Sequence, residues 1–392
     1  MSSLVTYGNL INGEWITNGE TFEVENKYTN QTFAKVAKAD EALIKQAISN
    51  AHETFYDHKL SVTERYGILM RAAELFTERK EELARIMVKE AGKTISDART
   101  EVERGVQTFI ASAEEAKQIT GQGLPIEAVP GNEEKMSFTI RVPVGVVCAI
   151  TPFNFPFNLT AHKVAPAIAA GNTIVLKPAE KTPVSAIMMA EILLEAGLPK
   201  GFFNVVNGYG HEAGPVLMAD ERIAMYTFTG SPNVGKQIKN NTGIRKVTLE
   251  LGNNSPNIIH HDVQDIDRAV QLVVTRGYSN SGQACISVQR VYVHEDIYEK
   301  VLQKAKGVAE SLVVGDPSLD ETNVGPMISL KEAERTEAWI NEAVAGGAEI
   351  VTGGKRDGAL FYPTILTKVT EDMKVMCEEV FAPVISIVPY SN

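Results

Sequence analysis

The chain has 392 residues, with 38 lysines and arginines against 49 aspartates and glutamates, and its formal net charge at pH 7 is −11. This length is enough for two or three domains with their own cores. The acidic balance argues against a nucleic-acid-binding protein, because phosphate backbones are bound by clustered lysine and arginine. The longest apolar run, 142–150, is interrupted by Pro143 and is too short to span a bilayer.

The N-terminus and the cysteines indicate a compartment. Residues 1–20 lack the basic start and the apolar centre of a secretory signal peptide. The three cysteines, Cys148, Cys285 and Cys377, form no C-x-x-C pair and cannot make a disulfide framework, which fits a reducing environment. We therefore expect a cytoplasmic protein with neither a membrane nor a nucleic acid as its partner.

The segment from residue 40 to about residue 120 is predicted to be helical. Ser61 and Glu64 form a capping-box pattern that opens an amphipathic helix, and Gly92 is a plausible end for that helix. Residues 121–142 are rich in Gly, Pro and polar residues and end in the alternating run SFTIRV. This pattern predicts a projecting β-hairpin, which either meets another subunit or is an ordinary edge hairpin.

From residue 142 onward, short β-rich runs alternate with helical runs. Five strands are predicted: VPVGVVCAI, TIVLK, FFNVV, MYTF and KVTLEL. The four intervening helices are predicted near 159–170, 183–196, 211–219 and 231–241. Parallel strands need helical crossovers, so this order predicts a doubly wound parallel α/β sheet. Ligands bind at the carboxyl ends of the strands in such a sheet, and the residues after each strand are therefore the candidates for a site.

A second α/β unit is predicted over 251–392. Its helices are expected near 266–278, 296–311 and 330–345, and its strands near Val291 and Ile385. The first unit then consists of 1–120 and 143–250, and the hairpin 121–142 lies between its two parts.

Cys285 is the sharpest local feature. It is flanked by small and polar residues before a strand, whereas Cys148 lies in an apolar strand and is expected to pack as a small hydrophobe. The Cys285 thiol could ionise if nearby N–H groups or a cation lower its pKa, which makes it a candidate nucleophile. The alternative is an incidental cysteine beside a turn.

Two polar clusters follow predicted strands. Gly230 and Ser231 open a helix and could hold a pyrophosphate, although an ordinary helix start has the same pattern. A nucleoside-triphosphate-binding loop is disfavoured, because Gln237 stands where such a loop needs a Ser or Thr. Lys177 and Glu180 could bind the hydroxyls of a ribose, or they could form a solvated salt bridge.

Glu250 lies between two leucines at the end of a predicted buried strand. A carboxylate there is a candidate general base or a structural acid. The seven histidines show no metal-ligand spacing, and His260 and His261 are adjacent on an apparent strand, where they would face opposite sides. No metal site is therefore predicted.

Taken together, these motifs resemble the aldehyde dehydrogenase superfamily, specifically its NAD(P)-dependent, non-acylating branch. Seven segments occur in the family's order: TPFNFP at 151–156, PAIAAGN at 166–172, KPAE at 177–180, FTGS at 228–231, LELG at 249–252, GQAC at 282–285 and EEVF at 378–381. The resemblance covers essentially the whole chain and is closest to lactaldehyde- and semialdehyde-type members.

The resemblance implies a role for each matching residue. Cys285 would attack the aldehyde carbon, Asn154 would hold the alkoxide, and Glu250 would activate the water that hydrolyses the thioester. Lys163 resembles a lysine near the proton path to that glutamate. The residues implied to bind the cofactor are Thr151, Pro152, Lys177, Glu180, Gly230, Ser231, Glu379 and Phe381.

The resemblance also implies a cofactor, a substrate class and partners. NAD is expected over NADP, because Glu180 would repel a 2′-phosphate. By resemblance, 1–120 with 143–250 would be an NAD-binding domain, 121–142 an oligomerisation hairpin and 251–392 a catalytic domain. The protein would be a homodimer or homotetramer when its C-terminal end is present. The substrate is expected to be a small hydrophilic aldehyde, with Phe157 at the entrance.

Four features depart from the family pattern, and the first is Phe153, which stands where the family usually has a tryptophan. Asn253 and Asn254 replace the usual Gly-Lys pair, Ala382 replaces a glycine, and family members continue well beyond the Pro383 segment, so the catalytic domain is expected to be incomplete at its end. A catalytically silent cofactor-binding or interaction protein and a CoA-acylating enzyme are the alternative functions.

Overall fold

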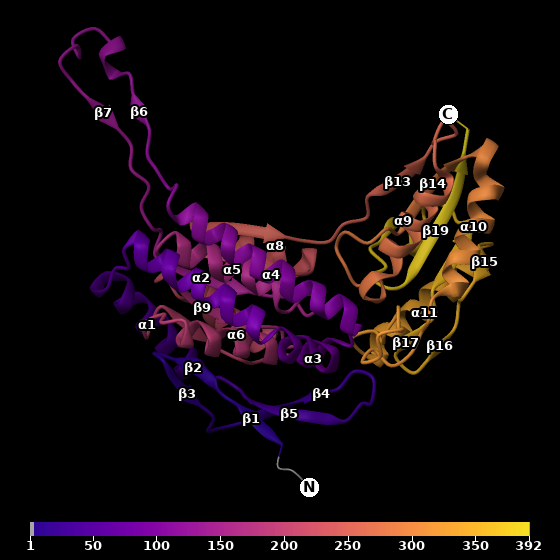
Figure 1. Cartoon of the computed structure of the whole chain (residues 1–392), viewed down its shortest axis with the longest axis horizontal. Helices are drawn as coiled ribbons and strands as arrows, with labels where there is room; N and C mark the ends of the chain where they lie inside the picture. The colour runs from indigo at the N-terminus through magenta and orange to yellow at the C-terminus, as the bar shows by residue number, and fades with distance from the viewer. Residues whose placement is uncertain (1–3, 392) are drawn as a thin grey trace.

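The computed structural model describes residues 4–391, and its main body contains two α/β units, each built on one large sheet (Figure 1). The larger sheet has the order β12-β11-β8-β9-β10-β2-β3. Its strands are β12 (Lys246–Glu250), β11 (Ile223–Thr229), β8 (Val146–Ile150), β9 (Thr173–Lys177), β10 (Phe203–Val205), β2 (Asn9–Ile11) and β3 (Glu14–Ile16). The first five are parallel, so the predicted doubly wound sheet is confirmed.

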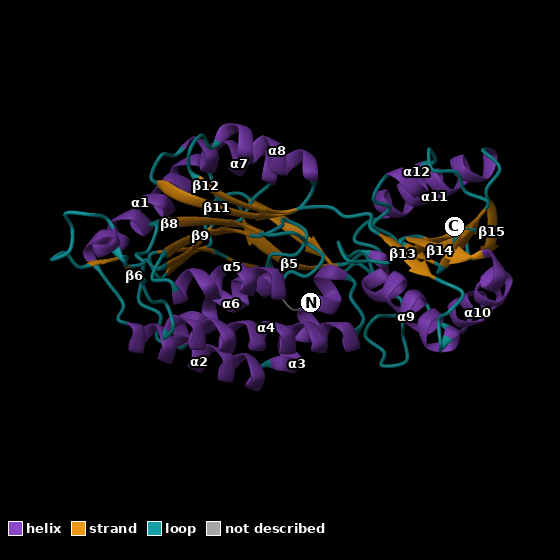
Figure 2. Ribbon diagram, turned by 90° about the horizontal axis from the view of Figure 1, so that it is seen from above, coloured by secondary structure: helices purple, strands orange, loops and turns teal. Residues whose placement is uncertain are grey.

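Helices cover both faces of this sheet, as Figure 2 shows. One face carries α1 (Glu41–Asp57), α7 (Gly210–Ala219) and α8 (Pro232–Asn241). The other carries α5 (Asn158–Ala169) and α6 (Val184–Glu195), and behind them lie α2 (Val62–Glu78), α3 (Lys80–Ala91) and α4 (Ile95–Ala116). Alternating strands and helices bury apolar side chains on both faces, which explains the near-continuous hydrophobic runs of the central strands.

The predicted helix from residue 61 to Gly92 is in fact two helices. Ser61 caps α2 through the complete capping box with Glu64, and Gly92 ends α3 with φ of 70°. Between them Arg79 leaves the helical conformation, with φ of −95° and ψ of 17°. Apolar periodicity continues across this short break because both helices pack against α4, and the break is therefore not visible in the sequence pattern.

The N-terminal strands were not predicted. Besides β2 and β3, the structure has a small sheet of order β1-β5-β4, with β1 at Val5–Tyr7, β5 at Thr32–Ala37 and β4 at Thr21–Glu25. Strands of three to six residues carry too few alternating positions to stand out from loop sequence.

The predicted hairpin projects from the body as a long arm (Figure 1). Only β6 (Gly123–Leu124) and β7 (Ser137–Phe138) pair along it, and a single 3₁₀ turn follows β6. Several of its large apolar side chains are exposed: Leu124, Val129, Met136, Phe138, Ile140 and Val142.

The second sheet has the order β13-β14-β19-β18-β15, and its first four strands are parallel. These strands are β13 (Pro256–Ile259), β14 (Arg290–His294), β19 (Val384–Tyr390), β18 (Thr364–Thr367) and β15 (Glu349–Thr352). One face carries α9 (Ile266–Tyr278) and α10 (Tyr298–Ser311), and the other carries α11 (Leu330–Ala345) and α12 (Lys374–Cys377). A short ladder pairs β16 (Arg356–Asp357) with β17 (Leu360–Phe361).

The prediction that His260 and His261 face opposite sides of a strand is wrong. Strand β13 ends at Ile259, so both histidines lie in the following turn, and their ring centroids are 4.2 Å apart. The two-residue period of side-chain direction holds only within a strand. Among residues 4–391, no helix is both long and apolar enough to cross a membrane.

Candidate active site

A cleft of about 710 Å³ lies at the carboxyl ends of the parallel strands of the larger sheet. Its wall includes the residues after β8, β9 and β11, together with Cys285 and a segment of the second unit. The predicted residues that line it are Thr151, Pro152, Asn154, Lys177, Glu180, Gly230, Ser231, Cys285, Glu379 and Phe381. The predicted residues outside its wall are Glu250, Lys163 and Phe157.

Asn154 and the loop before Cys285 are held together by hydrogen bonds. The Asn154 side-chain amide donates to the backbone oxygen of Gln283 at 2.9 Å, and Asn280 donates back to the Asn154 carbonyl at 3.1 Å. An asparagine amide has two N–H groups, so one remains for a ligand. The two loops come from different sheets and are thereby fixed relative to each other.

The loop before Cys285 has an unusual backbone. Asn280, Ser281 and Gly282 have φ values of 52°, 55° and 70°, all in the left-handed region. A Cβ on Gly282 would lie 2.0 Å from the Ala382 carbonyl oxygen, so only glycine fits there. Hydrogen bonds hold the strained turn: Asn280 donates its N–H to Asp97, and Ser281 donates to Gly325.

Cys285 is partly exposed in the cleft, whereas Cys148 is buried in β8, where desolvation raises its pKa to about 12. Burial also raises the pKa of the Cys285 thiol, and the carboxylates of Glu379 and Glu250 add to this shift. The backbone N–H groups of Cys285 and Ile286 lower the pKa but do not outweigh these effects. The sequence-based condition for an easily ionised thiol is therefore not met, and the thiol needs a proton acceptor.

Glu250 is not buried, contrary to the prediction. Its strand, β12, is the edge strand of the sheet, and the carboxylate is exposed. Val247 and Leu249 pack inward, whereas the alternate residues of the strand, Glu250 among them, face outward. Glu250 is nevertheless near enough to influence the pKa of both Cys285 and Lys163.

Lys163 lies on the buried face of α5. Its ammonium donates to Thr229 Oγ1 at 2.8 Å and to Thr227 Oγ1 at 3.2 Å, both on β11. Burial lowers the pKa of Lys163 to about 8, although the negative charge of Glu250 opposes this effect. Such an amine can exchange a proton near neutral pH.

Lys177 and Glu180 form a pair at one wall of the cleft. The Lys177 side chain is buried, with Nζ 3.0 Å from the Pro178 carbonyl and 3.4 Å from Glu180 Oε2. Burial lowers the pKa of Lys177, and Glu180 acts against that shift. The pair is not the solvated surface bridge that the sequence left open.

Gly230 and Ser231 form the turn between β11 and α8. Ser231 is the N-cap of α8 and accepts a hydrogen bond from the Val234 N–H. Gly230 donates its N–H to the Glu250 carbonyl at 3.0 Å, and a Cβ on it would lie 2.5 Å from the Phe228 ring. The exposed N–H groups of a helix N-terminus favour a bound anion such as a phosphate.

Glu379 and Phe381 close the cleft from the second unit. The Glu379 carboxylate accepts the N–H of Asn253 at 3.2 Å, and burial raises its pKa. Phe381 meets Phe153 edge to face, with centroids 6.0 Å apart. Gln289 accepts the Val380 N–H at 2.6 Å and so holds this segment beside β14.

The sequence matches known proteins over nearly its full length. Residues 15–392 match the model of the aldehyde dehydrogenase family. The chain belongs to this family. Its relatives include the 3-sulfolactaldehyde dehydrogenase of Priestia megaterium, which is 51% identical over 392 residues; these cover 100% of the chain and 82% of the relative.

Solved aldehyde dehydrogenases have the same fold. Aldehyde dehydrogenase 21 of Physcomitrella patens, crystallised with the reaction product succinate, superposes with a TM-score of 0.96 at 37% identity and covers 100% of this chain and 82% of that chain. The NAD⁺ complex of a Bacillus cereus aldehyde dehydrogenase gives 0.95 at 35% identity, with 99% and 80% covered. The predicted family, fold class and aldehyde-oxidising dehydrogenase activity are confirmed.

Sequence reasoning missed a buried ion pair that supports the site of this aldehyde dehydrogenase. Lys93 and Glu101 are 3.0 Å apart and almost fully buried. Glu101 accepts the N–H groups of Phe157 and Asn158, both at 3.0 Å, and thereby anchors the start of α5 just after Asn154. No local pattern marks the pair, because Glu101 falls among ordinary polar helix residues.

Phe157 does not line the entrance as expected. It is fully buried and packs edge to face on Phe76, with centroids 5.1 Å apart. The backbone bond to Glu101 turns this residue into the helical layer behind the sheet.

Proposed function

We propose that this aldehyde dehydrogenase oxidises a small hydrophilic aldehyde, such as a hydroxyaldehyde or a semialdehyde, to its carboxylic acid with NAD through a thioester on Cys285. The observation that carries the proposal is a single cleft that holds Cys285 and Asn154 together with the Lys177–Glu180 pair and Ser231. The named substrate of the Priestia relative and the product bound to the Physcomitrella enzyme support the substrate class.

The cleft residues fit a dinucleotide. The volume of the cleft lies within the usual range for small-molecule sites. Lys177 and Glu180 offer a donor and an acceptor for ribose hydroxyls, and the N-terminus of α8 with Ser231 offers N–H groups for a pyrophosphate. Thr151, Pro152 and Gly230 would shape the cleft floor, and Glu379 and Phe381 would contact the nicotinamide half. When bound, NAD accepts the hydride that leaves the substrate carbon.

The first half of the reaction is assigned to Cys285 and Asn154. The sulfur of the thiol bonds to the aldehyde carbon while a base accepts the thiol proton. The product of this addition is a thiohemiacetal with a negative oxygen. The free Asn154 N–H and the Cys285 backbone N–H stabilise the negative oxygen. Loss of hydride from the same carbon leaves a thioester on Cys285.

The second half requires water, and we assign its activation to Glu250. Water adds to the thioester carbon while Glu250 accepts one of its protons, and the carbon–sulfur bond then breaks to release the carboxylic acid and the Cys285 thiolate. The electrostatic influence of Glu250 on Cys285 and Lys163 supports this assignment. Lys163, with its pKa near 8, would pass the proton onward.

The overall proposal is tested by following reduced nicotinamide while the chain is given NAD and a panel of short aldehydes. Hydroxyaldehydes and semialdehydes should be turned over faster than apolar aldehydes of equal length. Formation of reduced cofactor only after CoA is added, with acyl-CoA as the product, would instead favour the acylating alternative.

Glu250→Gln should separate the two halves of the reaction. Glutamine cannot accept a proton, so steady-state turnover should fall by about 10² or more, while a rapid burst of reduced cofactor near one equivalent per Cys285 persists. Stopped-flow absorbance measures both. Glu221→Gln, an exposed carboxylate just before β11, is the matched control and should keep both rates. Loss of the burst along with turnover would show that Glu250 acts before hydride transfer.

Glu180→Gln should relax the preference for NAD over NADP. The carboxylate is partly exposed, so its repulsion of a 2′-phosphate is screened, and we expect the ratio of kcat/KM for NADP to that for NAD to rise about tenfold. Glu195→Gln, an exposed residue at the end of α6, should leave the ratio unchanged. An unchanged ratio in Glu180→Gln would remove this residue from cofactor selection.

The remaining assignments concern the units and the assembly. We propose that 1–120 with 143–250 binds NAD, that 251–392 is the catalytic domain, and that the hairpin 121–142 contacts a second copy in a homodimer or homotetramer. The exposed apolar side chains along the hairpin support the last point. A cytoplasmic location is proposed from the cysteine content.

A further inference from the structure

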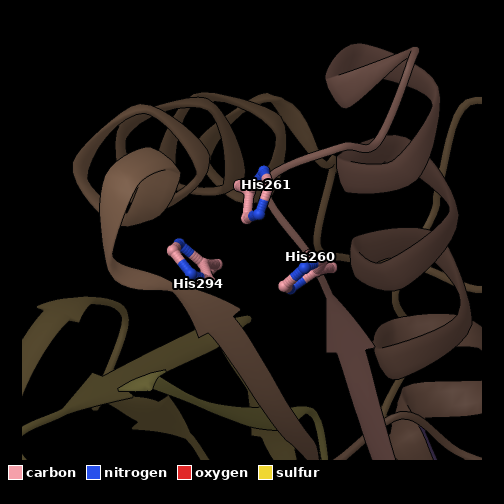
Figure 3. A group of neighbouring side chains, drawn as sticks. All are labelled: His260, His261 and His294. Carbon is pink, nitrogen blue, oxygen red and sulfur yellow. The ribbon is translucent and has the colours of Figure 1, made fainter. Parts of the chain in front are cut away.

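Three histidines gather at one edge of the second sheet (Figure 3). The parallel register pairs Ile259 of β13 with Val293 of β14, so the next residues, His260 and His294, are neighbours. The turn after β13 then brings His261 back to the same place. The ring centroid of His294 is 4.6 Å from that of His261 and 5.0 Å from that of His260.

The ring nitrogens of these histidines are arranged as metal ligands can be. One nitrogen from each of the three lies within 4.8 Å of the others. Tetrahedral zinc with nitrogen at about 2.0–2.1 Å needs nitrogens about 3.3 Å apart. His261 is exposed, while His294 is buried and His260 is held by a hydrogen bond to Tyr390, so rotation of the His261 side chain is the movement that can close the gap. In Figure 3 the three rings surround one point.

Neighbouring oxygens can orient two of the rings. Tyr390 lies opposite His294 in the β14–β19 register, and its hydroxyl is 2.7 Å from Nδ1 of His260. Nδ1 of His294 accepts the backbone N–H of Asp296 at 3.3 Å and lies 3.5 Å from the Asp296 carboxylate. A His260 tautomer with hydrogen on Nδ1 would donate to the Tyr390 hydroxyl and leave Nε2 for a metal, as is usual for metal-bound histidines. For Nε2 of His294 to bind a metal, its Nδ1 would have to exchange the Asp296 N–H for the nearby Asp296 carboxylate as its partner.

The cluster is separate from the cleft. Cys285 lies before the first residue of β14, whereas His294 is its last residue, and the three histidines are absent from the cleft wall. Figure 1 shows these strands ending near the C-terminal label, away from the junction between the sheets.

We propose that His260, His261 and His294 bind one divalent transition-metal ion, with Zn²⁺ as the best match and water completing its coordination. Imidazole nitrogens favour Zn²⁺, Ni²⁺ and Cu²⁺ over Mg²⁺ and Ca²⁺, which prefer oxygen ligands. The ion would tie the ends of β13 and β14 together and would not take part in aldehyde oxidation.

The test is a calorimetric Zn²⁺ titration of the full chain without a polyhistidine tag. Thiolates also bind zinc, so the titration uses the Cys285→Ser/Cys377→Ser background. We expect one ion per chain, and at least about tenfold weaker binding in His261→Ala. Tyr390→Phe should weaken binding without abolishing it. His58→Ala, which removes an exposed histidine at the end of α1, is the matched control and should bind as the background does.

A second measurement covers variants that fold poorly. Zn²⁺ should raise the thermal unfolding temperature of the background protein and of His58→Ala, but not that of His261→Ala, whose side chain is exposed and dispensable for packing. The proposal is overturned if Zn²⁺ does not bind, if His261→Ala and His294→Ala bind it as tightly as the background, or if His58→Ala loses as much affinity as His261→Ala. An equal response to Mg²⁺ would also overturn it.

Discussion

Cys285→Ala is expected to abolish aldehyde oxidation, with a loss in kcat of about 10⁴-fold or more. No other cysteine lines the cleft described in residues 4–391, so no neighbouring thiol can form the thioester. Removal of a covalent nucleophile leaves only the rate that binding and oxyanion contacts provide. The measurement is reduced-cofactor absorbance with NAD and the best aldehyde of the panel.

Two controls make this result specific. Cys285→Ala should still bind NAD with nearly unchanged affinity, measured by calorimetry, because the pyrophosphate and ribose contacts lie elsewhere in the cleft. Cys377→Ala removes an exposed thiol at the end of α12 and should retain full activity. A Cys285→Ala variant as active as the parent chain would eliminate the proposed nucleophile.

Glu101→Ala is expected to destabilise the protein by about 3–5 kcal/mol. The change leaves the buried Lys93 ammonium without its partner and leaves the N–H groups of Phe157 and Asn158 without an acceptor. Because these groups fix the start of α5, Asn154 should also shift from its position, and activity should fall even where the chain remains folded. Urea unfolding followed by circular dichroism measures the free energy of unfolding.

A surface ion pair between α3 and α4 is the matched control. Glu103 pairs with Lys80, and its side chain is 61% exposed, so Glu103→Ala should cost no more than about 1 kcal/mol. The double variant Lys93→Met/Glu101→Gln should recover part of the loss, because no unpaired buried charge remains. Equal costs for Glu101→Ala and Glu103→Ala would contradict the importance assigned to the buried pair.

Some parts of the site followed directly from local sequence. Lys177 and Ser231 come at the ends of clear strand patterns, and the carboxyl ends of parallel strands meet at one edge, so their convergence on the cleft could be predicted. Glu379 and Phe381 could be assigned only through the family resemblance, since the chain places no strong periodic signal around them.

Other features depended on partners far away in the chain. Glu250 was expected to be buried because leucines flank it, yet β12 is an edge strand and one of its faces is open. The pKa of Cys285 depends on the nearby carboxylate of Glu379, which is 94 residues later in the chain. His294 meets His260 only because β13 and β14 pair in a particular register.

The amino-acid pattern alone determined the order of strands and helices between residues 142 and 250, the doubly wound sheet, the projecting hairpin and the motifs of the family. These depend on side-chain periodicity and turn residues within short segments, which act before any distant contact forms. Tertiary structure alone decided which strand is at the edge, which charges are buried together and which histidines meet. Burial and electrostatics depend on neighbours in space, and those are set only when segments far apart in the chain pack against one another.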